Sequence, residues 1–221
     1  MSSVPMQSPG APTRRPALLL AAVLVIGVAA ASALWAGTTH RADSSLRAPA
    51  AADIGFCQEM AAHHDQAVLM ATLALDRAGP TVKAIAASIL VSQSQETGIL
   101  RGWLQLWGEP PMALAPAPGK LANSGSYCLV PRQGGMPGMA SPQELNQLWR
   151  DSGDAFDILF LQLMIRHHEG GLLMSHDAQL TARLDLVRNT ARAMVVEQTE
   201  ELGQMRRILQ ADGAQPLPSP K

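Results

Sequence analysis

The feature that most constrains the fold is a segment that occurs twice. Residues 56–70 and 160–174 share Phe, Gln, Met, His-His, Leu and Met at the same positions. A second pair of segments repeats further along the chain, where Gln93, Glu96, Gly98, Arg101 and Leu104 correspond to Gln198, Glu201, Gly203, Arg206 and Leu209. A chain with such internal similarity is expected to fold as two similar substructures that pack together.

Both copies have the spacing of amphipathic helices. Apolar or small residues recur three or four positions apart. Asp53 and Asp154 are expected N-caps, and Gly79-Pro80 and Gly108 are stop signals. Ser141 to Glu144 has the pattern of a capping box. The expected helices cover about 53–78, 82–107, 142–153, 155–178 and 183–212.

The two copies are separated by a long segment with little periodicity. Residues 109–140 are rich in proline and glycine, which predicts a loop. Two helical hairpins joined by one long connection are typical of a four-helix bundle with a crossover. We therefore predict an all-α fold, with the bundle over 53–213 and a loose tail over 214–221.

The amino terminus has the features of an export segment. Residues 17–36 carry no charge and follow Arg14 and Arg15 in the 1–16 segment, which favours a membrane anchor with a cytoplasmic start. A signal peptide that is cleaved after Ala31-Ser-Ala33 stays open as an alternative. Either arrangement places the linker 37–52 and the bundle outside the cytoplasm, in the periplasm or on the outer face of the membrane.

The chain has two cysteines, Cys57 and Cys128. Outside the cytoplasm such a pair is able to oxidise, so the two residues form a candidate disulfide. Cys57 also lies three positions before Met60 on nearly the same helix face. A role for Cys57 as a metal ligand therefore stays open as an alternative.

Charge and composition narrow the range of functions. The net charge is -1 and 16% of the residues are charged, so there is no basic surface of the kind that binds nucleic acid. The chain has 11 methionines against three Phe and one Tyr. Met194 and Met205 are expected to pack in the core, where methionine is an adaptable filler.

The duplicated histidines and methionines are candidate metal ligands. At 100° per residue they share an arc of about 120° on each helix. The set comprises Met60, His63, His64 and Met70 in the first copy and Met164, His167, His168 and Met174 in the second. Glu96 and Glu201 lie on the apolar stripes of the partner helices, as ligands or as buried partners of His or Arg. Met136 and Met139 in the loop are placed to pass a soft ion inward.

These ligand types select among metals and among functions. Thioethers favour Cu(I), and imidazole suits copper and zinc. A ferritin-like oxidase with iron is a second hypothesis, but the Glu-x-x-His spacing of di-iron bundles is missing from both histidine helices. A third is a metal-free interaction or sensor protein of the envelope, with structural histidines.

Four motifs carry a resemblance to a known family. They are residues 53–70, Trp103-Leu-Gln-Leu-Trp107-Gly, Met136-Pro-Gly-Met139 and residues 156–171. These motifs and their order in the chain resemble those of the domain-of-unknown-function 305 (DUF305) family. The resemblance implies a ferritin-like four-helix fold and copper handling by the Met and His positions. A periplasmic copper-binding member of that family is linked to copper resistance.

The sequence therefore predicts an extracytoplasmic copper-binding protein rather than an enzyme. Its expected cargo is Cu(I), with Cu(II), zinc or iron as other possible ions. It would sequester the metal, confer resistance or pass the metal to an envelope copper-transport partner. The membrane is the other expected partner, through the N-terminal helix, and the sequence leaves the oligomeric state open.

Overall fold

The computed structural model describes residues 48–112 and 136–220, and this part of the chain is all-helical. It contains α2 (Ala51–Arg77), α3 (Pro80–Trp107), α4 (Pro142–Arg150), α5 (Gly153–Thr181) and α6 (Asp185–Ala211). The predicted all-α class is confirmed. None of the described helices is long and apolar enough to cross a membrane. The predicted anchor over 17–36 lies outside the described residues.

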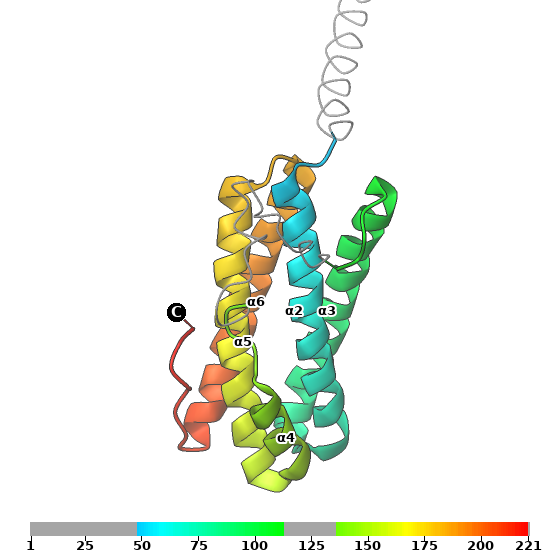
Figure 1. Cartoon of the computed structure of the whole chain (residues 1–221). Helices are drawn as coiled ribbons and strands as arrows, with labels where there is room; N and C mark the ends of the chain where they lie inside the picture. The colour runs from blue at the N-terminus through cyan, green and yellow to red at the C-terminus, as the bar shows by residue number, and fades with distance from the viewer. Residues whose placement is uncertain (1–47, 113–135, 221) are drawn as a thin grey trace, which may run out of the picture. The chain divides into compact units, whose positions relative to one another are not determined.

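Four long helices form two hairpins that pack through their histidine-bearing helices (Figure 1). Helix α2 packs on α3, α5 packs on α6, and α2 contacts α5. Helices α2 and α5 run in opposite directions, whereas α3 and α5 run in the same direction. Helix α3 therefore ends at the opposite end of the bundle from the start of α5, which is typical of a bundle with a crossover connection.

The helix starts differ from the predicted caps. The N-cap of α2 is Ala50, and Asp53 lies in the first turn rather than at the cap. Its Oδ2 accepts the Ala50 N–H at 2.7 Å. Its Oδ1 accepts the N–H groups of Arg183 and Leu184 at 3.0 and 2.9 Å. Asp53 therefore joins the start of α2 to the turn between α5 and α6, which a local cap would not do.

The third long helix begins two residues earlier than a cap at Asp154 would allow. Ser152 is the N-cap of α5 and Asp154 lies in its first turn. The capping box of α4 is present as predicted, because Ser141 Oγ accepts the Glu144 N–H and Glu144 Oε2 accepts the Ser141 N–H. The tail, expected to be loose, contacts the bundle, since Gln162 donates to the Gln215 carbonyl at 2.7 Å.

The apolar core divides into two clusters, and each contains methionines from both copies of the repeat. Met60 is in one cluster, with Met174 packed against it. Met70 and Met164 are in the other cluster. A methionine from the start of one copy therefore shares a cluster with a methionine from the end of the other copy. The antiparallel course of α2 and α5 explains this pairing, because the start of one copy lies beside the end of the other.

Candidate metal centre

The four duplicated histidines are buried where α2 meets α5. His63 is 1% exposed and His64, His167 and His168 are 0% exposed. The rings of His63 and His167 lie 3.7 Å apart between centroids, with an interplanar angle of 31°. The structure thus brings corresponding residues of the two copies into direct contact, at a depth where water does not reach them.

Hydrogen bonds define which ring nitrogen of His63 and of His167 carries hydrogen. His63 Nε2 lies 3.1 Å from the Pro137 carbonyl oxygen, and His167 Nε2 lies 2.9 Å from the His63 carbonyl oxygen. A carbonyl oxygen only accepts, so Nε2 donates in both rings. In a neutral ring the lone pair is then on Nδ1, and both Nδ1 atoms are buried without a hydrogen-bond partner within the described structure.

The other two histidines form hydrogen bonds with carboxyl groups from α3 and α6. His64 Nε2 lies 2.8 Å from Glu96 Oε2, and His168 Nε2 lies 2.7 Å from Glu201 Oε2. His64 Nδ1 has no partner among the described residues, whereas His168 Nδ1 lies 3.0 Å from the Met164 carbonyl. Glu96 and Glu201 are therefore hydrogen-bond partners of histidine in this structure, and a role for them as metal ligands stays a prediction. Both ring nitrogens of His168 have a partner.

Burial keeps the imidazoles of His63, His64 and His167 neutral. Desolvation, followed by the repulsion of His64, lowers the pKa of His63 to about 3. Desolvation, followed by the repulsion of His168, lowers the pKa of His64 to about 3. The pKa of His167 is well below its usual value, chiefly through burial and then through His63. Burial and the neighbouring Glu201 raise the pKa of Glu96 to about 7. Neutral rings retain the lone pairs that metals require.

We expect the stability of the metal-free protein to fall as the pH drops below about 6.5, and more steeply below about pH 4.5. Histidine has a pKa of 6.5 when unfolded, whereas His63 and His64 take up protons only near pH 3 in the fold. Within this window the unfolded state binds more protons and is favoured as the pH falls. Glu96 has the opposite effect on stability between about pH 7 and pH 4.5. Its pKa is raised in the fold, so the folded state binds more protons in this range.

Urea unfolding at pH 7, 4.5 and 3.5 measures this effect. For each pH unit, the midpoint should drop more between pH 4.5 and 3.5 than between pH 7 and 4.5, because the opposing contribution of Glu96 is complete by pH 4.5. The drop should be smaller in a His63→Gln, His64→Gln variant. An equal drop in the variant would show that these rings are not buried in the neutral state.

The methionines surround the histidines along both helices. Met60, Met70 and Met164 are fully buried, and Met174 is partly buried. Among the described residues, His, Cys, Asp and Glu side chains form no group of three that could hold a metal ion. Among donors of other kinds, the thioethers of the repeated motif are the nearest to the histidines in sequence.

The loop methionines differ from the helix methionines in exposure. Met136 and Met139 are both partly exposed, within the described segment that precedes α4. The backbone of this segment reaches the centre, since Pro137 accepts the His63 hydrogen bond. The sequence pattern indicates the Met side chains but not the Pro137 carbonyl, because a backbone acceptor in an aperiodic loop leaves no pattern.

Cys57 is buried, and burial together with Asp53 raises the pKa of its thiol to about 12. Its sulfur is free in this structure, whereas Cys128 lies outside the described residues. The disulfide therefore remains a prediction. A thiol with so high a pKa stays protonated at neutral pH and is a poor metal ligand unless the metal itself displaces the proton.

The fold and the buried histidine pairs define a class of duplicated helical bundles with a polar centre. A family model for a domain of unknown function, DUF305, matches residues 53–209. The chain belongs to the DUF305 family. No curated protein matches the chain.

Solved structures share this fold. A DUF305 protein of Streptomyces coelicolor, described as secreted, is 32% identical with a TM-score of 0.67, covering 76% of this chain and 97% of that one. A DUF305 fragment from Deinococcus radiodurans is 31% identical with a TM-score of 0.63, and the match covers 75% of this chain and 99% of that fragment. CopM in its Cu(I)-bound form is 24% identical with a TM-score of 0.57, covering 73% and 98%. At that identity the likeness to CopM concerns the fold.

Proposed function

We propose that this protein is an extracytoplasmic copper-binding protein that holds Cu(I) at the buried histidines, for sequestration or for transfer to a partner. The observation that carries the proposal is the state of His63, His64 and His167. Each has an Nδ1 atom that is buried and without a hydrogen-bond partner within the described structure. A buried polar atom without a partner is costly, and a bound cation would remove that cost.

The ligand chemistry favours a soft ion as the cargo. Neutral imidazoles and thioethers both bind Cu(I), and thioethers discriminate against hard cations such as Mg²⁺. Methionine has no proton to lose, so its binding does not depend on pH. CopM, which shares the fold, has been solved with Cu(I) and with Ag bound. A bundle that stores or passes on Cu(I) requires no catalytic turnover.

Native mass spectrometry of the full chain tests this function. The protein is titrated with Cu(I), Cu(II), Zn(II) and Fe(II) in the presence of a competing chelator. Retention of Cu(I) above the other ions is the expected result. Retention of two Fe with Cu(I) easily removed would instead favour an oxidase, and retention of no metal would indicate structural histidines.

A fourfold leucine variant tests the thioethers in the same titration. Replacement of Met60, Met70, Met164 and Met174 by Leu nearly conserves volume and apolarity, so the bundle should persist. The Cu(I) affinity should fall by about tenfold or more, because loss of even an outer partner of a metal site costs that much. The Zn(II) affinity should change little.

Met194→Leu with Met205→Leu is the matched control. Both residues are fully buried in the same two clusters but lie outside the duplicated motif. This control alters core packing in the same way and should leave Cu(I) affinity unchanged. An equal Cu(I) affinity in the fourfold variant and in the native protein would remove thioethers from the site.

A further inference from the structure

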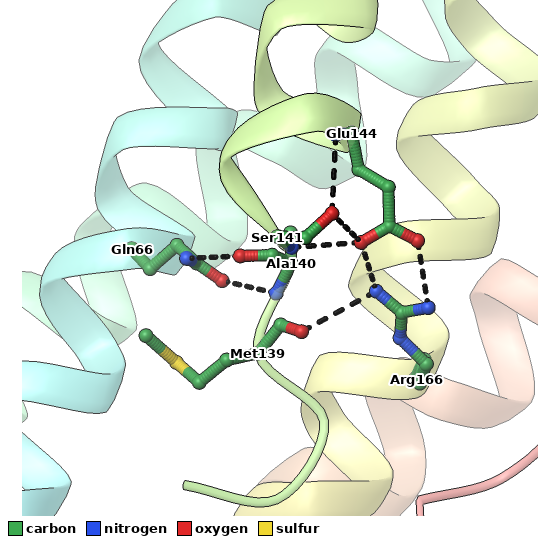
Figure 2. A network of polar contacts seen from close by, with 6 residues as sticks. All are labelled: Gln66, Met139, Ala140, Ser141, Glu144 and Arg166. Atoms are coloured by element: carbon green, nitrogen blue, oxygen red, sulfur yellow. Dashed lines mark hydrogen bonds and ion pairs between the residues drawn. The ribbon is translucent and has the colours of Figure 1, made fainter. Parts of the chain in front are cut away.

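A short segment before α4 lies across the two histidine helices and is held to both of them. We call residues 136–141 the strap. On the α2 side, Gln66 donates to the Ala140 carbonyl at 3.0 Å and accepts the Ala140 N–H at 2.7 Å. On the α5 side, Arg166 donates to the Met139 carbonyl at 3.4 Å. Figure 2 shows these contacts meeting at the strap from the two sides.

An ion pair adds a second attachment at the end of the strap. Both terminal nitrogens of Arg166 donate to Glu144, at 2.8 and 2.7 Å, and Glu144 Oε2 also accepts from Ser141 (Figure 2). These contacts, chiefly the hydrogen bond from Arg166, lower the pKa of Glu144 to about 2. The carboxylate is therefore charged over the physiological range, and the strap end stays attached to α5.

Two glycines let the strap approach α5 more closely than any other residue would allow. A Cβ at Gly170 would collide with the Pro137 carbonyl, and a Cβ at Gly138 would collide with the Arg166 carbonyl. Gly138 also has φ of 79°, a conformation that favours glycine. The position of the repeat that is Gly170 in the second copy is Gln66 in the first. The same helix position therefore admits the strap on α5 and binds it on α2.

We propose that the strap is a positioning element for His63: its Pro137 carbonyl accepts the Nε2 hydrogen and so keeps the Nδ1 lone pair free for the metal. The inference rests on the proposed function and deepens it. His63 Nε2 lies 3.1 Å from that carbonyl, and His63 Nδ1 has no other partner among the described residues. A hydrogen bond at one ring nitrogen is the usual means of setting which nitrogen binds a metal.

His167 provides a comparison within the same molecule. Its Nε2 donates to the His63 carbonyl in α2 rather than to the strap. A change confined to the strap should therefore alter the tautomer of His63 and leave that of His167 as it is. A general loosening of the bundle would alter both.

Gly170→Ala is the direct test, because the added methyl group occupies the place of the Pro137 carbonyl. Gly98→Ala is the matched control, since its Cβ would meet nothing within 4 Å. The tautomers of His63 and His167 are read in the metal-free full chain from the nitrogen shifts of the rings in long-range NMR spectra. Cu(I) affinity is measured in parallel by competition with a chelator.

In native protein and in Gly98→Ala, both rings should carry hydrogen on Nε2. In Gly170→Ala, His63 should lose this preference while His167 keeps it, and Cu(I) affinity should fall by about 10-fold to 100-fold. Hydrogen on Nδ1 of His63 in the native chain, or an unchanged His63 in Gly170→Ala, would overturn the proposal.

Glu144→Gln is a second variant that adds no bulk. It weakens the attachment to Arg166. The tautomer equilibrium of His63 should therefore shift in the same direction as in Gly170→Ala, by a smaller amount. This variant decides the matter if Gly170→Ala does not fold. If the native chain binds no Cu(I), the proposed function fails, while the NMR measurement still decides whether the strap positions His63.

Discussion

Replacing His63 and His167 together with glutamine is expected to lower the Cu(I) affinity by at least about 100-fold. The change of an outer partner alone costs about 10-fold to 100-fold, and here two candidate ligands are lost. Glutamine retains an N–H donor for the Pro137 and His63 carbonyls that the rings now contact. It offers no aromatic nitrogen with a lone pair, so binding is removed with little change to the hydrogen bonds.

The measurement is competition with a Cu(I) chelator, with circular dichroism to show that the helices persist. His176→Gln is the control, because His176 is an exposed histidine on the same helix α5 and should bind as the native protein does. Equal Cu(I) affinity in the double variant and in the control would mean that the facing rings are structural. That result would favour the hypothesis of a metal-free sensor or interaction protein.

Replacing Asp53 with alanine is expected to destabilise the fold by at least about 4 kcal/mol. Asp53 is fully buried and accepts three backbone N–H groups, from Ala50, Arg183 and Leu184. Hydrogen bonds to charged groups contribute about 1.5–3 kcal/mol each, and buried donors left without a partner add a further cost. The change also separates the start of α2 from the turn between α5 and α6.

Urea unfolding measured by circular dichroism gives this free energy. Asp53→Asn should lie between the native protein and Asp53→Ala, because its carbonyl oxygen can still accept from Arg183 and Leu184. Asp76→Ala is the control, since Asp76 is exposed near the end of the same helix. A loss no larger than that of the control would show that water replaces the carboxylate at Asp53.

The fold was largely predictable because the repeat contains its own periodicity. The spacing of apolar residues predicts four long helices, and Gly108 and the Ser141–Glu144 capping box are visible as local signals. The caps Asp53 and Asp154 were misplaced, because an aspartate near a helix start serves equally well in the first turn. Asp53 accepts hydrogen bonds from Arg183 and Leu184, and this turn is distant from Asp53 in sequence.

The centre was predictable in its side chains and not in its hydrogen bonds. Buried histidines on matching faces follow from the helical arc, and the pairing of His64 with Glu96 was one of two roles expected for that carboxyl. The Pro137 carbonyl could not be anticipated, because loop residues carry no period. Arg166 adjoins the histidine pair, but nothing in the sequence links it to Glu144.

The antiparallel course of α2 and α5 limits how the two copies can diverge. In a tandem array each repeat can adapt by itself, whereas here Met60 and Met174 belong to one apolar cluster, and Met70 and Met164 belong to the other. A substitution in one copy therefore alters the packing around residues of the other copy. We expect the effects of substitutions in the two copies to be coupled, because residues in one cluster do not act independently.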